Sequence, residues 1–341
     1  MPKTYDVAVV GPTGPVGEAM LEILAQRDFP VGKIYPLAGE GATGKRIEFR
    51  NSHVRIGNLA DFDFTTVQIG LFAGSSELAE AYAPKAAAAG CVVIDNSPFF
   101  RDTDDVPLVV PEVNPERIAD YRSRGIIANP DCSTIQMLVA LKPIHDFAGI
   151  ERINVATYQA VSGSGTDAIR ELADQTARLL NGKAITRPVA YAKQIAFNAI
   201  PQIGDAMDNG YTREEMMLVW ETARVLGDPG IRVNPTAVRV PVFFGDSQAL
   251  HIETRDKVSR AKAVELLAAA PGVKVLDSRE SGGYATAVTE AANDDNVFIS
   301  RIREDLSHAK GLDLWVVADN VRKGAALNSV QIAEILIASY I

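Results

Sequence analysis

A cysteine lies where a helix is predicted to begin. Cys132 stands within residues 129–134 (Asn-Pro-Asp-Cys-Ser-Thr), and the apolar residues that follow keep helical spacing. The N-terminus of a helix favours negative charge, so it favours the thiolate, the nucleophilic form of a cysteine. Ser133 and Thr134 could cap the free amides of the first turn. A lone cysteine is also commonly a small core residue, so this pattern alone leaves both interpretations open.

Length and composition describe an ordinary globular protein. The chain has 341 residues, of which 47% are hydrophobic and 23% charged, and this predicts about two domains. Its net charge of −9 argues against nucleic acid or a membrane surface as a partner. Two cysteines and four scattered histidines do not suggest a metal site, and Cys91 is expected to be inert core. The chain shows no signal peptide and no apolar stretch near ~20 residues, so we expect a cytoplasmic protein.

A glycine-rich turn follows the first apolar segment. Residues 5–10 predict a buried strand, and residues 11–17 (Gly-Pro-Thr-Gly-Pro-Val-Gly) then lead into an amphipathic helix. In a dinucleotide-binding turn of this form, small residues let backbone amides approach a pyrophosphate. We therefore predict cofactor contacts at Gly11, Thr13, Gly14, Val16 and Gly17. Glu40, after the next predicted strand, could bind an adenosine ribose or could be an ordinary solvated charge.

The order of the predicted elements indicates an α/β fold. Strand-like segments up to residue 128 alternate with helical ones, which predicts a Rossmann-like parallel sheet covered by helices. Cys132 follows the last of these strands, beyond the sheet edge where ligands bind. Further along, strand-like segments at 155–161, 237–242, 249–253 and 314–318 indicate a second, α+β domain with a broad sheet. We place the first domain at 1–131 with 321–341, and the second at 132–320.

Several short segments together match a known family. They are Asn96-Ser97 with Phe100-Arg101, residues 106–114, Asn129-Pro130 with residues 132–136, residues 159–163, residues 239–242, and Asp319-Asn320 with residues 322–326. Along nearly its whole length the chain resembles the aspartate-β-semialdehyde dehydrogenase family. The resemblance implies an NADP-binding domain and a catalytic and dimerisation domain. It also implies reversible, NADPH-dependent reduction of aspartyl phosphate to aspartate semialdehyde through a cysteine thioester, a step of amino-acid biosynthesis.

The resemblance assigns roles to individual residues. It implies Cys132 as the nucleophile and Gln159 as the residue that positions the substrate. Arg239 would bind the substrate carboxylate, Glu214 its amino group and Arg101 the phosphate, and these residue types suit those ligands. Ser162, Gly163 and Asn320 are expected to contact the cofactor. The implied partners are a small amino-acid-like ligand and a second copy of the chain in a homodimer, with no metal and no covalently bound cofactor.

Three positions depart from the family. Asp246 stands where the family has its acid/base histidine, and the ordinary pKa of Asp is ~3.9 against ~6.5 for His, which makes Asp246 a weak base and a very weak acid. Met217 stands where the family has a phosphate-binding lysine. Asp131 replaces an asparagine beside the nucleophile. The last two changes shift the charge toward negative, which opposes phosphate, and a carboxylate beside Cys132 disfavours its thiolate.

No other histidine is expected to substitute for the missing one. His251 is five positions along the same predicted strand, so its side chain should face the opposite side of the sheet. His145 is thirteen residues into the predicted helix, about 20 Å from Cys132. Asp246 therefore remains the third candidate catalytic residue, beside Cys132 and Gln159.

The departures from the family affect both the expected cofactor and the expected activity. Gly41 and Ala42 stand where the family holds the 2′-phosphate of NADP, so we expect NADP or NAD without a preference. We interpret the chain as a Usg-type paralogue with lost or reduced activity. One alternative is an active aspartate-semialdehyde dehydrogenase of low rate. The other is a phosphate-independent, NAD-linked aldehyde dehydrogenase in which carboxylates activate water against a Cys132 thioester.

Overall fold

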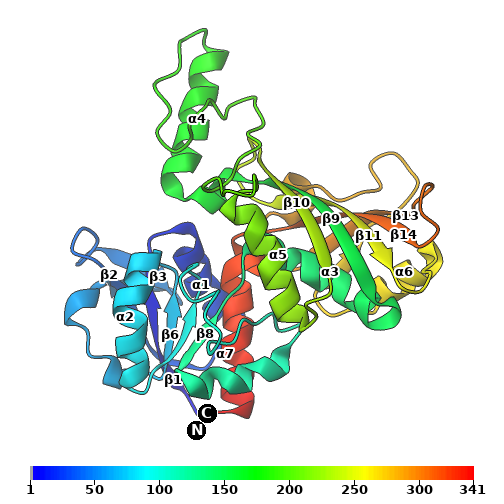
Figure 1. The fold of residues 1–341 in the computed structure, drawn as a ribbon. Coiled ribbons are helices and arrows are strands. Elements are labelled where there is room, and N and C mark those ends of the chain that lie inside the picture. The colour runs from blue at the N-terminus through cyan, green and yellow to red at the C-terminus, as the bar shows by residue number, and fades with distance from the viewer. Residues whose placement is uncertain (1–2) are drawn as a thin grey trace. The chain divides into compact units, whose positions relative to one another are not determined.

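The structure is a computed structural model that describes residues 3–341. The chain divides into two compact units (Figure 1): Met1–Asp131 with Ala325–Ile341, and Cys132–Gly324. The division between the second unit and the C-terminal segment lies four residues after the predicted one, at 324 rather than 320. None of the helices in residues 3–341 has the length and apolar character that a membrane span needs.

The first unit is built on a six-stranded parallel sheet. Its strand order is β5-β2-β1-β6-β7-β8, which is the doubly wound order with a switch point between β1 and β6. The strands are β1 Tyr5–Val10, β2 Val31–Ala38, β5 Gly57–Asn58, β6 Ile69–Phe72, β7 Val92–Asp95 and β8 Ile126–Ala128. The helices are α1 Pro15–Gln26, α2 Ser76–Ala88 and α7 Leu327–Ser339. The predicted Rossmann-like parallel sheet is confirmed.

The C-terminal helix is part of this first unit. α7 packs against α1, and Arg27 pairs with Glu334 at 2.7 Å between Nε and Oε1. A hairpin of β3 (Arg46–Phe49) and β4 (Ser52–Arg55) was not predicted. β3 alternates polar and apolar residues over only four positions, and β4 has a single apolar residue, Val54.

The second unit is built on a six-stranded mixed sheet of order β10-β9-β11-β14-β13-β12. Its outer pairs are parallel and its inner pairs antiparallel. The strands are β9 Ile150–Gln159, β10 Arg232–Arg239, β11 Asp246–Thr254, β12 Val273–Val275, β13 Val297–Glu304 and β14 Gly311–Ala318. The helices are α3 Cys132–Ala148, α4 Thr166–Leu180, α5 Arg213–Leu226 and α6 Arg260–Ala268. The predicted α+β second unit is confirmed.

The two faces of this sheet differ in burial. On β9 and β11 alternate residues are fully buried, and α3, α5 and α6 pack against strands of this sheet. The intervening residues, such as Tyr158 and His251, are only half-buried. Because side chains alternate across a strand, residues of β9 and β11 that share the buried face lie close together. The polar residues on it include Thr157, Gln159, Asp246 and Gln248.

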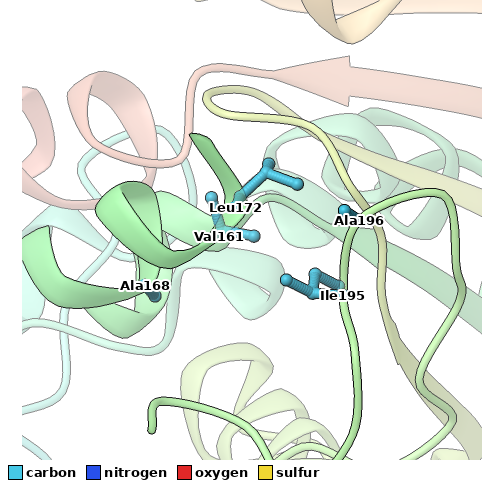
Figure 2. Close-up of a cluster of buried hydrophobic side chains, with 5 residues drawn as sticks. All are labelled: Val161, Ala168, Leu172, Ile195 and Ala196. Carbon is cyan, nitrogen blue, oxygen red and sulfur yellow. The ribbon is translucent and has the colours of Figure 1, made fainter. Parts of the chain in front are cut away.

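α4 extends away from the mixed sheet and is tied to the unit by a small apolar cluster. Figure 2 shows this cluster, in which Leu172 and Ala168 of α4 meet Val161 and the loop residues Ile195 and Ala196. Gln175 of α4 also accepts hydrogen bonds from the backbone amides of Ile195 and Ala196. The cluster therefore fixes the helix that directly follows residues 159–165 of the site.

Leu172→Ala tests this role. The side chain is 2% exposed, so its loss leaves a cavity, and we expect the free energy of unfolding to fall by about 3 kcal/mol. The control on the same helix is Leu180→Ala, where the side chain is 75% exposed and the expected change is within about 0.5 kcal/mol. Urea denaturation measures both. Equal effects of the two substitutions would contradict this assignment.

Candidate active site

Cys132 is the first residue of α3, as the sequence predicts. Its thiol donates a hydrogen bond to the carboxylate of Asp246, with 3.5 Å between Sγ and Oδ2. These residues are separated by 114 positions in the chain and are brought together by the packing of α3 against β11. The structure therefore places a proton acceptor directly beside the predicted nucleophile.

Asp246 is fixed by the backbone around it. It is 1% exposed, and its Oδ1 accepts a hydrogen bond of 2.7 Å from the amide of Ala160. The preceding residue, Gly245, has φ +88°, and a Cβ there would lie 2.6 Å from the carbonyl oxygen of Ala287. Glycine at 245 is thus required for the chain to enter β11 with Asp246 pointing at the cysteine.

Gln159 and Glu214 form a second hydrogen-bonded pair in this unit. The Gln159 amide donates to Ser133 Oγ at 2.9 Å and to Glu214 Oε1 at 3.0 Å. Gln159 thereby connects the first turn of α3 to the start of α5. Thr134 does not serve as the predicted cap, because its buried hydroxyl has no hydrogen-bond partner among residues 3–341.

Arg239 is buried beside the same backbone segment. Its Nη1 donates a hydrogen bond of 2.6 Å to the carbonyl oxygen of Ala160, and Arg239 is only 5% exposed. A Cβ at Gly163 would lie 3.1 Å from that Nη1, so the glycine leaves room for the guanidinium. Within the described chain Arg239 Nε has no hydrogen-bond partner. A buried guanidinium with an unused donor suits a carboxylate ligand.

Asn320 and Ser162 bond to each other. The Asn320 amide donates to Ser162 Oγ at 2.9 Å, and Asn320 Oδ1 accepts from the amide of Gly245 at 3.0 Å. Asn320 therefore holds the turn that precedes Asp246. Its predicted contact with a cofactor stays a prediction.

The start of α5 accounts for the neighbouring acidic residues. Thr212 and Glu215 form a reciprocal capping box, and Glu215 also accepts from the amide of Ala237. Glu215 is therefore structural, whereas Glu214 bonds to Gln159. Met217, three residues after Glu214, is 6% exposed and supplies no charge.

The glycine turn of the first unit has the geometry that a dinucleotide requires. Gly11 has φ +80°, and a Cβ on Gly17 would lie 2.1 Å from the Gly11 carbonyl oxygen. Gly14 is the N-cap of α1 and provides no side-chain cap, so amides of the first turn can meet a pyrophosphate. Thr13 and Val16 lie in the same turn. The predicted residues thus fit a bound nicotinamide dinucleotide.

Arg101 is surrounded by its own unit. It is 8% exposed, donates to the carbonyl oxygens of Asn129 and Asn96, and pairs with Asp131 at 3.6 Å between Nη1 and Oδ2. Burial raises the pKa of the nearby Asp95 to about 6. Hydrogen bonds from Ser97 and the charge of Arg101 act in the opposite direction. Arg101, the residue predicted to bind phosphate, therefore has a carboxylate of the protein as its ion-pair partner.

The remaining histidines and the second cysteine lie outside this constellation. His251 is on the other face of the sheet and bonds to Asp313, which confirms the prediction for its side chain. His145 accepts a hydrogen bond from the amide of Ile150 after α3, and burial lowers its pKa. Cys91 is 1% exposed and burial raises its pKa to about 12, which confirms it as inert core. Over residues 3–341 no group of His, Cys, Asp and Glu is arranged to hold a metal ion.

Two residues of the site had no role in the sequence analysis. Gln248 is fully buried and donates to the carbonyl oxygen of Ser133 at 2.9 Å, which ties β11 to the first turn of α3. A Cβ at Gly324 would lie 2.8 Å from that of Cys132. Gly324 belongs to a segment that carries the family resemblance, but its closeness to Cys132 comes from tertiary packing, which spacing alone does not reveal.

A doubly wound parallel sheet with a glycine-rich first turn is typical of dinucleotide-binding proteins. Known families match both units: the semialdehyde dehydrogenase NAD binding domain matches residues 6–121, and the semialdehyde dehydrogenase dimerisation domain matches residues 141–323. An aspartate-semialdehyde dehydrogenase of Shewanella sp. (strain DB6705) is 56% identical over 340 residues, which cover 100% of both chains.

Solved structures agree with this assignment. The crystal structure of aspartate semialdehyde dehydrogenase II from Vibrio cholerae has a TM-score of 0.97 and 53% identity, and the match covers 99% of this chain and 100% of that one. A second structure of that enzyme, complexed with ASA (aspartate semialdehyde), matches equally well. The chain belongs to the aspartate-semialdehyde dehydrogenase family.

These comparisons correct the interpretation of the chain as a Usg-type paralogue. The relatives are named aspartate-semialdehyde dehydrogenases over their full length, and loss of activity is not supported. The three departures at Asp131, Met217 and Asp246 are present in the chain, but they do not by themselves indicate an inactive branch.

Alkylation of Cys132 tests the thiol–carboxylate pair. Asp246→Asn keeps the shape of the side chain and removes a negative charge that opposes the thiolate. We expect iodoacetamide to alkylate Cys132 roughly tenfold faster in this variant at neutral pH, because the thiolate is the reactive form of the cysteine. Intact-mass spectrometry measures the rate, and Cys132→Ala shows any labelling of Cys91. An unchanged rate would mean that the carboxylate does not act on the thiol. A slower rate would contradict the expected charge effect and would indicate that Asp246 removes the thiol proton.

Proposed function

We propose that the chain is an active aspartate-semialdehyde dehydrogenase, which interconverts aspartyl phosphate and aspartate semialdehyde with a nicotinamide dinucleotide. The observation that carries the proposal is the 3.5 Å approach of Cys132 Sγ, on a partly exposed residue, to Oδ2 of the buried Asp246. The match over the full length to enzymes of this name supports the substrate assignment.

The residues of the second unit have distinct roles in this proposal. Arg239, with its unused Nε donor, binds the α-carboxylate of the substrate, and Glu214 binds its ammonium group. Gln159 holds Glu214 and the first turn of α3 in place. The amino-acid end of the substrate is thereby fixed, and its carbonyl carbon can meet the thiol.

Proton transfer in this proposal runs between sulfur and carboxylate. As Cys132 attacks the aldehyde carbon, the thiol proton passes to Asp246 and a carbon–sulfur bond forms. When bound, the oxidised nicotinamide dinucleotide would supply the hydride acceptor that this oxidation to a thioester requires. Phosphate then takes the acyl group and the sulfur departs as the leaving group, with Asp246 available to return the proton. Burial keeps Asp246 fixed, which costs no reorganisation during the step.

We also infer a homodimer formed through the half-buried face of the mixed sheet. This face carries Tyr158 and Trp315, whose rings lie 5.7 Å apart, together with His251. The family description of residues 141–323 as a dimerisation domain supports this inference. A second copy would cover side chains that the helices of the unit do not.

Reduction of the dinucleotide by aspartate semialdehyde tests the proposed activity. We expect purified protein to reduce NADP or NAD in the presence of phosphate, followed at 340 nm as for any nicotinamide, and Cys132→Ala to abolish turnover. Omission of phosphate should lower the rate. Absence of turnover with both cofactors, in protein shown to be folded, would refute the proposal.

A further inference from the structure

We propose that the Cys132–Asp246 pair also delivers acyl groups from the cysteine to water, so that the protein hydrolyses activated acyl compounds, such as short acyl esters and acyl phosphates, without a cofactor. The inference rests on the proposed function in one respect, namely that Cys132 carries the acyl group. It adds a second acyl acceptor and a second activity to the same site.

The first support is the position and state of the carboxylate. Asp246 Oδ1 is held by the Ala160 amide at 2.7 Å, which directs Oδ2 to the sulfur at 3.5 Å. A carboxylate held in this position is an acceptor for a proton from a neighbouring water molecule. A base beside the sulfur can reach the acyl carbon of a thioester through one water molecule.

The second support is the charge around the phosphate residues. Arg101, the expected phosphate-binding residue, is paired with Asp131 at 3.6 Å between Nη1 and Oδ2 and donates to two backbone carbonyls. Met217, at the position of the family's lysine, adds no positive charge. Within its own unit, each of these features lowers the positive charge offered to a dianion, whereas water carries no charge and does not depend on it. Transfer of the acyl group from Cys132 to water is therefore favoured relative to its transfer to phosphate.

The hydrolytic cycle balances without an oxidant. Cys132 attacks the carbonyl carbon of R–CO–X, its proton passes to Asp246, and X departs with that proton as HX. Asp246 then takes a proton from water as the new carbon–oxygen bond forms. The carbon–sulfur bond breaks, and the thiolate recovers the proton. The net reaction is R–CO–X plus water giving R–COOH plus HX.

The experiment uses 4-nitrophenyl acetate with the full-length protein in phosphate-free buffer and no dinucleotide. Release of 4-nitrophenol reports acylation, and intact-mass spectrometry follows the acetyl-cysteine. We expect acylation at Cys132, absent in Cys132→Ala, and then decay of the thioester to free enzyme. In Asp246→Asn the decay should be about 100-fold slower, since a general base is lost.

A matched control separates this effect from a general change of the sheet. Asp313→Asn makes the same carboxylate-to-amide change on β14, at a residue that bonds to His251 on the other face. Its thioester should decay at the wild-type rate. Thermal unfolding shows whether each variant is folded, and decay in the wild type is informative even if Asp246→Asn does not fold.

The outcomes distinguish this inference from the proposed dehydrogenase. A wild-type thioester that persists until phosphate is added would overturn the hydrolytic activity and leave the dehydrogenase intact. Decay at the same rate in Asp246→Asn as in the wild type would also overturn it. Failure of Cys132 to acylate at all would count against both the inference and the proposed nucleophile.

Discussion

The site depends on one buried carboxylate. Removing a charged carboxylate from water is costly unless hydrogen bonds replace the lost solvation. Asp246 is 1% exposed, and the amide of Ala160 and the thiol of Cys132 provide such bonds. The carbonyl oxygen of Ala160 is in turn held by Arg239, so the backbone at this one residue links the acid to the expected carboxylate-binding residue. A change at any of these positions therefore disturbs the others.

Several glycine residues and side-chain amides stabilise this arrangement. Gly245 permits the backbone to enter β11, Asn320 bonds to its amide, and Gly324 leaves space beside Cys132. Gln248 and Gln159 join the sheet to the first turn of α3. The chemistry of the site is thus built from a rigid sheet and one helix end. Such rigidity favours positioning of reacting atoms over adaptation to many ligands.

Much of the fold follows from sequence patterns, but the central contact of the site does not. Apolar runs and the glycine turn predict β1, α1 and the parallel sheet, and the helical period predicts that α3 begins at Cys132. The strands β12 and β13 and the helices α5 and α6 were not predicted, since their burial is set by tertiary neighbours. The pairing of Cys132 with Asp246 joins residues 114 positions apart. Judged one at a time, the substitutions at Asp131, Met217 and Asp246 suggest lost activity, because sequence reasoning assigns Asp246 the properties of an isolated aspartate and omits its fixed position beside the thiol.

The pH dependence of turnover is the most direct test of Asp246 as the acid/base group. The measurement compares kcat/KM for aspartate semialdehyde in the wild type and in Asp246→His, which restores the family residue. The ordinary pKa is ~3.9 for an Asp carboxyl and ~6.5 for a His imidazole, so exchanging one base for the other at this position should change the pH dependence of turnover. We expect the acidic limb of the profile to move to higher pH in Asp246→His. Coincident acidic limbs in the two proteins would contradict it, because the residue at 246 would then not be the group that exchanges the proton.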